Sequence, residues 1–160
     1  MRVSDRLLLI IGPAAVLASV DLIVKATVPT SAWAFHHRSG VWVALSIVLL
    51  VGAAVLCVVP SPAVALAAGV MSAGVIGNLV SARANGNSVP NPLTISRGDY
   101  TLAFNLADVY FLLGNLLLMT ALMVETVRNR DRLAPARGWE RALLRRFSGP
   151  RVDRGPGAEE

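Results

Sequence analysis

The sequence predicts an all-α integral membrane protein, a four-transmembrane-helix bundle with short outer loops. Of the 160 residues, 54% are apolar, and the mean hydropathy is +0.59. These values are more typical of a membrane domain than of a soluble globule. Four apolar segments are each long enough, at about 20 residues, to cross a hydrocarbon layer about 30 Å thick. The basic residues gather toward the ends of the chain, since nine of the 15 follow Val127.

The first span is expected over residues 7–28. Asp21 and Lys25 precede the only sequence that loosely imitates a signal-peptide cleavage site, so we interpret this segment as an uncleaved helix. The two residues stand four apart and therefore share a helix face, where we expect an ion pair. The pair could simply anchor the helix, with Lys25 reaching the membrane surface, or it could form a polar wall of a site.

The second span is expected over residues 41–59, an unbroken apolar run that contains the only cysteine, Cys57. The loop before it carries the adjacent histidines His36 and His37. Adjacent side chains do not face the same way on a helix or strand, and no third ligand accompanies them. The sequence therefore predicts no metal site and no cofactor.

The third span is expected over residues 62–82. Gly69, Ala73 and Gly77 recur every four residues, and such a stripe of small residues lets another helix approach closely. Asn78 follows near the end of the span. There it could cap the helix or belong to a functional site.

The fourth span is expected over residues 102–124. Asn105 and Asp108 lie in its first turns, on the same face. An acidic side chain at the centre of a membrane helix costs about 2.5–3.5 kcal/mol, and less near the interface. Asp108 is therefore the first functional candidate. The loop over 83–100 is rich in turn-forming residues and leaves room for a minor β-hairpin, although no alternation of apolar and polar residues is convincing.

We divide the chain into a membrane domain at 1–127 and a basic tail at 128–160. Within the tail, residues 139–147 repeat apolar side chains with helical spacing and could form an amphipathic helix on a membrane surface. Basic residues at both ends place both termini in the cytoplasm. The expected partner of this charge is the lipid bilayer and not nucleic acid.

With this topology, polar residues from three helices lie at one level near the outer membrane surface. They are Asp21 and Lys25 from the first helix, Asn78 from the third and Asp108, with Asn105, from the fourth. A cluster at one depth is a better argument for a site than any single member of it.

Three short motifs resemble those of the lipoprotein signal peptidase family (signal peptidase II). They are the segment Phe104-Asn105-Leu106-Ala107-Asp108, the segment Gly74-Val75-Ile76-Gly77-Asn78, and Asp21 with Lys25 four residues later. The family consists of four-helix aspartic proteases of the bacterial cytoplasmic membrane, which cut prolipoproteins just before the lipid-modified cysteine. The resemblance implies that Asp108 is a catalytic carboxylate and that Asn78, Asn105, Asp21 and Lys25 help to bind the substrate.

The chain departs from the family where the second catalytic aspartate should stand. That position holds Pro90, or Asn91 after a shift of one residue. An aspartic protease needs two carboxylates that share a proton. Only Asp99 and Asp21 are weak candidates for the missing one.

Two hypotheses follow. The chain could be a degenerate member that binds a lipoprotein signal peptide, a lipid or a partner transmembrane helix without cleaving it. Alternatively, it could be an active, divergent lipoprotein signal peptidase with Asp99 or Asp21 as the second carboxylate. Roles unrelated to this family, including transport, are a further alternative.

Overall fold

The computed structural model describes residues 1–130, so most of the basic tail, with the amphipathic helix expected at 139–147, lies outside the described residues. The chain divides after Met123, and the features below lie in Met1–Met123 except for the last residues of α4. The elements in chain order are α1 (Val3–Thr27), the 3-10 turn η1 (Ala32–Ala34), β1 (Phe35–His37), α2 (Gly40–Val55), the 3-10 turn η2 (Leu56–Val58), α3 (Pro62–Ala84), β2 (Ser88–Pro90), β3 (Leu93–Arg97), β4 (Tyr100–Phe104) and α4 (Leu106–Arg128).

Within residues 1–130, four helices are long and apolar enough to cross a membrane, which confirms four candidate spans and indicates a membrane protein. The most apolar window of α3 is 67% buried, whereas the corresponding windows of α1, α2 and α4 are 22%, 11% and 17% buried. Helix α3 is therefore the central element, and the other three present most of their apolar side chains outward, as expected for helices that face lipid.

Glycines in α3 let its neighbours approach closely. A Cβ atom at Gly69 would lie 2.7 Å from the backbone oxygen of Ile10 in α1, and one at Gly77 would lie 2.6 Å from the carboxylate of Asp21. These contacts confirm the stripe expected from the sequence and show that α1 and α3 run in the same direction. Gly74, on another face of α3, meets the backbone of Ala107 and Phe111 in α4.

Two helix boundaries differ from the sequence prediction in ways that matter for the site. Helix α4 begins at Leu106 and not at residue 102, because residues 100–104 form strand β4. Asn105 therefore precedes the helix. Helix α3 continues to Ala84, so Asn78 lies well inside it and does not cap its end.

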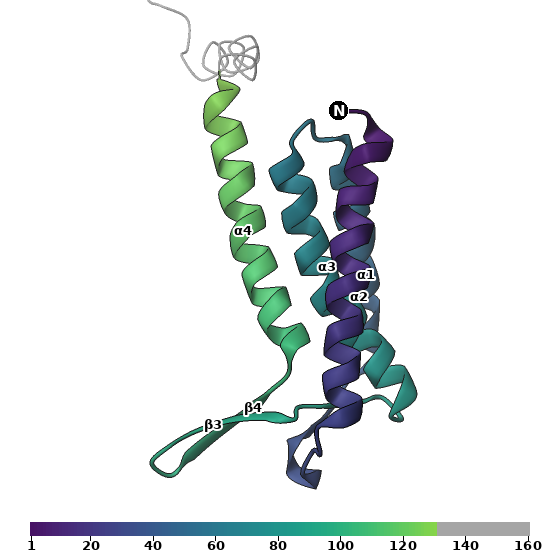
Figure 1. Ribbon diagram of the computed structural model, residues 1–160, viewed down its shortest axis with the longest axis vertical. Helices are drawn as coiled ribbons and strands as arrows, with labels where there is room; N and C mark the ends of the chain where they lie inside the picture. Colours follow the sequence, from purple (N-terminus) through teal and green to yellow (C-terminus); the bar gives the residue numbers. More distant parts are fainter. Residues whose placement is uncertain (131–160) are drawn as a thin grey trace, which may run out of the picture. The chain divides into compact units, whose positions relative to one another are not determined.

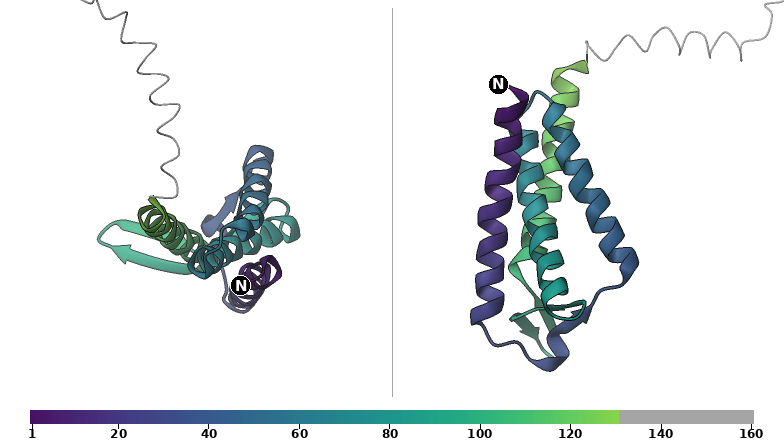
Figure 2. Two further views of the ribbon diagram at one scale, coloured as in Figure 1. Left: turned by 90° about the horizontal axis from the view of Figure 1, so that it is seen from above. Right: turned by 90° about the vertical axis from the view of Figure 1, so that its right-hand side faces the viewer.

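Strands gather at the end of the helices where α1 and α3 finish and α2 and α4 start, here called the loop end (Figure 2). Strand β1 pairs antiparallel with β2, and His36 stands opposite Val89. Strands β3 and β4 form a hairpin around a turn in which Gly98 has a φ of +60°, a conformation that favours glycine. The hairpin leaves the start of α4 and runs across the direction of the helices (Figure 1). The turn-forming residues of the sequence left room for a hairpin but did not indicate where either sheet lies.

Candidate functional site

Asp108 lies in the first turn of α4, where it and Asn105 form a reciprocal cap. The backbone N–H of Asp108 donates to Asn105 Oδ1 at 3.0 Å, and the backbone N–H of Asn105 donates to Asp108 Oδ2 at 3.3 Å. This pattern satisfies N–H groups that have no partner within the helix. The spacing of these two residues thus has a structural role, and one carboxylate oxygen of Asp108 is engaged in it.

The other oxygen of Asp108 joins a chain of polar contacts through the helices. Asn78 Nδ2 donates to Asp108 Oδ1 at 2.9 Å, and Lys25 Nζ donates to Asn78 Oδ1 at 2.8 Å. Lysine is only a donor and an ionised carboxylate only an acceptor, so these partners fix the orientation of the Asn78 amide. Asn78 therefore connects α1 to α4 from its position in α3.

Asp21 is committed to structural contacts. Its Oδ2 atom lies 2.7 Å from Lys25 Nζ, which confirms the expected ion pair, and its Oδ1 accepts from the backbone N–H of Ala107 at 2.8 Å. The Asp21 side chain is 0% exposed and that of Lys25 is 3% exposed. A carboxylate is favourable beside the first N–H groups of a helix, because these carry partial positive charge. Asp21 consequently positions the start of α4.

On the other side of Asn105, the polar chain continues into the loops. Asn105 Nδ2 donates to Asn91 Oδ1 at 2.5 Å, and Asn91 Nδ2 lies 2.9 Å from His36 Nδ1. Asn91 is 2% exposed, and its Nδ2 also donates to the backbone carbonyl of Ala103 at 3.4 Å. Asn91, one of the two positions where the resemblance would place the second aspartate, thus hydrogen-bonds to Asn105.

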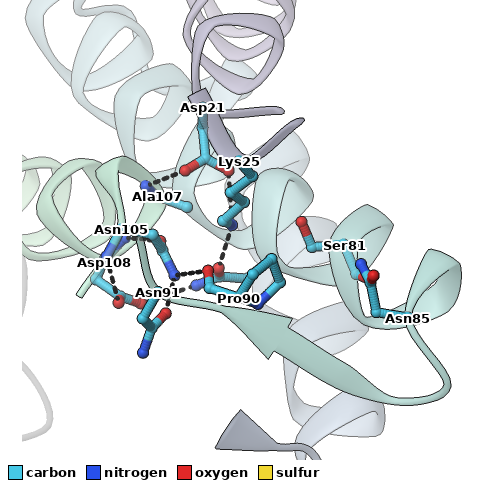
Figure 3. Close-up of polar contacts among 10 residues, drawn as sticks. Asp21, Lys25, Ser81, Asn85, Pro90, Asn91, Asn105, Ala107 and Asp108 are labelled. Atoms are coloured by element: carbon cyan, nitrogen blue, oxygen red, sulfur yellow. Dashed lines mark hydrogen bonds and ion pairs between the residues drawn. The ribbon is translucent and has the colours of Figure 1, made fainter. Parts of the chain in front are cut away.

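Figure 3 shows the labelled members of this network, which come from α1, from the start of α4 and from the loop after β2, namely Asp21, Lys25, Asn91, Asn105 and Asp108. Five of the predicted site residues belong to one connected network at the loop end, namely Asp21, Lys25, Asn78, Asn105 and Asp108.

Asp99 is not part of this network. It is exposed and lies in the turn between β3 and β4, at the far end of the hairpin. At a rise of about 3.3 Å per residue, β4 carries it about 16 Å away from Phe104. Asp99 therefore cannot share a proton with Asp108 while the hairpin keeps this register.

A pocket of about 220 Å³ opens beside Asp108, between α2, α3 and α4. Its wall combines polar and apolar side chains, and the residues that line it are Arg38, Trp42, Ser46, Leu49, Gly74, Val75, Asn78, Asp108 and Phe111. The guanidinium carbon of Arg38 lies 5.1 Å from the centre of the Trp42 ring, within the range of a cation–π contact. The Nε atom of Arg38 is buried and has no hydrogen-bond partner.

The predicted site did not include the side of this pocket that α2 and the residue just before it form. Arg38, Trp42, Ser46 and Leu49 follow one another at intervals of four, four and three residues, which is the spacing of a single helix face. Ser46 is also the one hydroxyl in an otherwise apolar span, and it is buried. This combination of a helical repeat with an isolated polar residue was the available signal.

Chemically, the site offers hydrogen bonds and charge but only one carboxyl group that faces the pocket. Within residues 1–130, Asp108 contacts amide N–H groups, and the hydrogen bonds of its side chain involve no second carboxyl. In the same part of the chain, no three His, Cys, Asp or Glu side chains lie close enough together to hold a metal ion.

Comparison with known proteins gave no match, whether with family models, with curated proteins or with solved structures. The resemblance to signal peptidase II therefore depends on the three motifs alone.

Proposed function

We propose that the chain is a signal peptidase II-like membrane protein that binds the apolar signal segment of a lipid-modified prolipoprotein without cleaving it. One observation carries the proposal. Asp108 lies in a pocket next to apolar side chains, while both of its oxygens accept hydrogen bonds from amides and neither contacts a carboxyl within residues 1–130.

The composition of the pocket supports binding of a peptide. Trp42, Leu49 and Phe111 supply apolar surface, whereas Asp108 and Arg38 supply an acceptor and a donor. A peptide segment that leaves helical geometry at membrane depth must find partners for its backbone N–H and C=O groups. A pocket with one group of each kind meets that need.

The positions and contacts of the other acidic side chains argue against cleavage. Peptide hydrolysis by an aspartic protease needs one carboxylate to take a proton from water and a neighbouring one to donate a proton to the carbonyl. Asp21 is held by Lys25 and by the backbone of Ala107, and Asp99 lies at the far end of the hairpin. Neither is available as the partner of Asp108.

Binding can be tested by photocrosslinking in lipid vesicles. The photoreactive residue p-benzoylphenylalanine is introduced at Phe111, which lines the pocket, or at Leu112, which is 73% exposed on the next face of α4. We expect a diacylglyceryl-modified prolipoprotein to crosslink at position 111 and not at 112. Equal crosslinking at both positions contradicts a specific site. Crosslinks to lipid alone would assign the pocket to a lipid.

Cleavage is tested in the same vesicles by searching for the mature lipoprotein. We expect none from the native chain. Suppose that the native chain yields mature product, that Asp108→Asn yields none and that Asn115→Ala still yields it. The chain is then an active peptidase and the binding proposal is wrong. Asn115 is a suitable control because its side chain donates only to the Phe111 carbonyl of its own helix.

A further inference from the structure

The β3–β4 hairpin has two faces of opposite character. Side chains two residues apart share a face of a strand, and paired residues share it across the ladder. One face pairs Leu93 with Phe104, Ile95 with Leu102 and Arg97 with Tyr100. The other pairs Thr94 with Ala103 and Ser96 with Thr101, whose hydroxyl groups lie 3.0 Å apart. We call the first set the apolar hairpin face.

Nothing in residues 1–130 covers the outer part of this apolar face. Ile95 is 60% exposed, Leu102 is 65% exposed and Tyr100 is 85% exposed. Only the base of the hairpin is buried to any degree, at Leu93, Ala103 and Phe104. A two-stranded hairpin in water is at best marginally stable on its own, so this element lacks a packing partner.

The position of the hairpin in the chain indicates what that partner is. Strand β4 ends at Phe104 and α4 begins at Leu106, so the base of the hairpin lies where a candidate span starts. The hairpin runs across the helix direction and therefore extends along the plane in which the spans end (Figure 1). The neighbouring first turns of α4 also expose apolar side chains, since Val109 is 41% and Leu112 73% exposed.

We propose that the apolar hairpin face lies on the membrane and inserts Ile95 and Leu102 into the lipid interface. Tyr100 then takes the headgroup level that amphipathic aromatic rings prefer, and Arg97, opposite it, reaches lipid phosphates. Ser96 and Thr101 face water. This proposal depends on the membrane placement of the helices and not on the function proposed for the Asp108 pocket.

The faces can be distinguished with an environment-sensitive NBD label on the full chain. Cys57 is the only cysteine, so Cys57→Ala provides a background for single labels. Leu102→Cys and Thr101→Cys are neighbours on opposite faces of β4, and Ile95→Cys with Ser96→Cys repeats the comparison on β3. The protein is placed in vesicles of phosphatidylcholine and phosphatidylglycerol.

We expect labels at 102 and 95 to emit at shorter wavelength, to resist quenching by iodide and to be quenched by lipids that carry a nitroxide. Labels at 101 and 96 should behave in the opposite way. Equal iodide quenching on both faces overturns the proposal. Protection at 102 from iodide without quenching by nitroxide lipids also overturns the proposal, because protein and not lipid then covers the face. If that protection depends on the density of protein in the vesicles, the covering protein is a second copy of the chain.

Discussion

Lys25 is the residue on which the polar network depends, because its ammonium group joins a carboxylate on α1 to an amide on α3. Both contacts are shorter than 3 Å, and its side chain is almost fully buried. The ion pair is therefore shielded from water, whereas ion pairs exposed to water contribute little to stability. Removing one partner of a buried pair leaves an uncompensated charge, which costs far more than removing both.

We expect Asp21→Asn to lower the free energy of unfolding by about 3–5 kcal/mol, the range for breaking a buried ion pair from one side. The double variant Asp21→Asn with Lys25→Met should recover part of this loss, because it removes the unpaired charge as well. Reversible unfolding in detergent micelles measures both changes. A double variant that is less stable than Asp21→Asn would show that the pair does not act as a unit.

The sequence predicted which polar residues meet but not what each one does. The spacing of Asn105 and Asp108 correctly places them together, and so does that of Asp21 and Lys25. The cap that Asn105 and Asp108 form was not predicted, because the apolar residues of β4 extend the hydrophobic run upstream of Asn105 and conceal the helix start. The contact of Asp21 with Ala107 joins distant segments, and no local pattern indicates it.

At the scale of elements, α3 is the helix that fits closely against its neighbours. Its glycines face backbone and side-chain atoms of α1 and α4 at distances that leave no room for a methyl group. Because lipid tails are as apolar as the helices, close packing replaces much of the hydrophobic driving force between membrane helices. The glycines of α3, and Gly114 of α4 that faces Met71 in α3, should therefore matter more for stability than glycines with open space, such as Gly52.

We expect Gly77→Ala to destabilise the protein by about 1–3 kcal/mol, the usual cost of overpacking. The new Cβ atom would lie 2.6 Å from Asp21 Oδ2, which cannot retreat without straining its contacts to Lys25 and Ala107. Gly52→Ala in α2 is the matched control, since nothing lies within 4 Å of its Cβ position. There, alanine should stabilise the helix by about 0.5–1 kcal/mol. Thermal unfolding of both variants in micelles tests the difference, and equal effects would contradict the packing.

The four spans were predictable to within a few residues because apolar length is a strong signal. The start of α4 was misplaced for a physical reason. Tyr100 to Phe104 are mostly apolar and run into the helix, and hydropathy alone does not separate a strand from a helix. The turn at Gly98 was the local sign of a hairpin.

At the scale of the whole described unit, the two loops at the loop end are one assembly. Strand β1 comes from the loop between α1 and α2, whereas β2 comes from the loop between α3 and α4. Their pairing brings His36 next to Asn91. Asn91 in turn contacts Asn105, which directly precedes α4. Contacts between such distant segments leave no pattern in either one, so the sequence could not predict this sheet.

The register of β1 and β2 can be tested by engineered disulfides in the Cys57→Ala background. His37 stands opposite Ser88, and residues directly opposite in an antiparallel pair have Cα atoms about 4.5–5.5 Å apart, which suits a disulfide. We expect His37→Cys with Ser88→Cys to lose both free thiols on mild oxidation, measured by maleimide mass labelling. The pair His36→Cys with Ser88→Cys is slipped by one residue, so its side chains point to opposite faces and should stay reduced. If the slipped pair oxidises as readily as the aligned one, the loops do not form this sheet, and the link from β1 through Asn91 to Asp108 is lost with it.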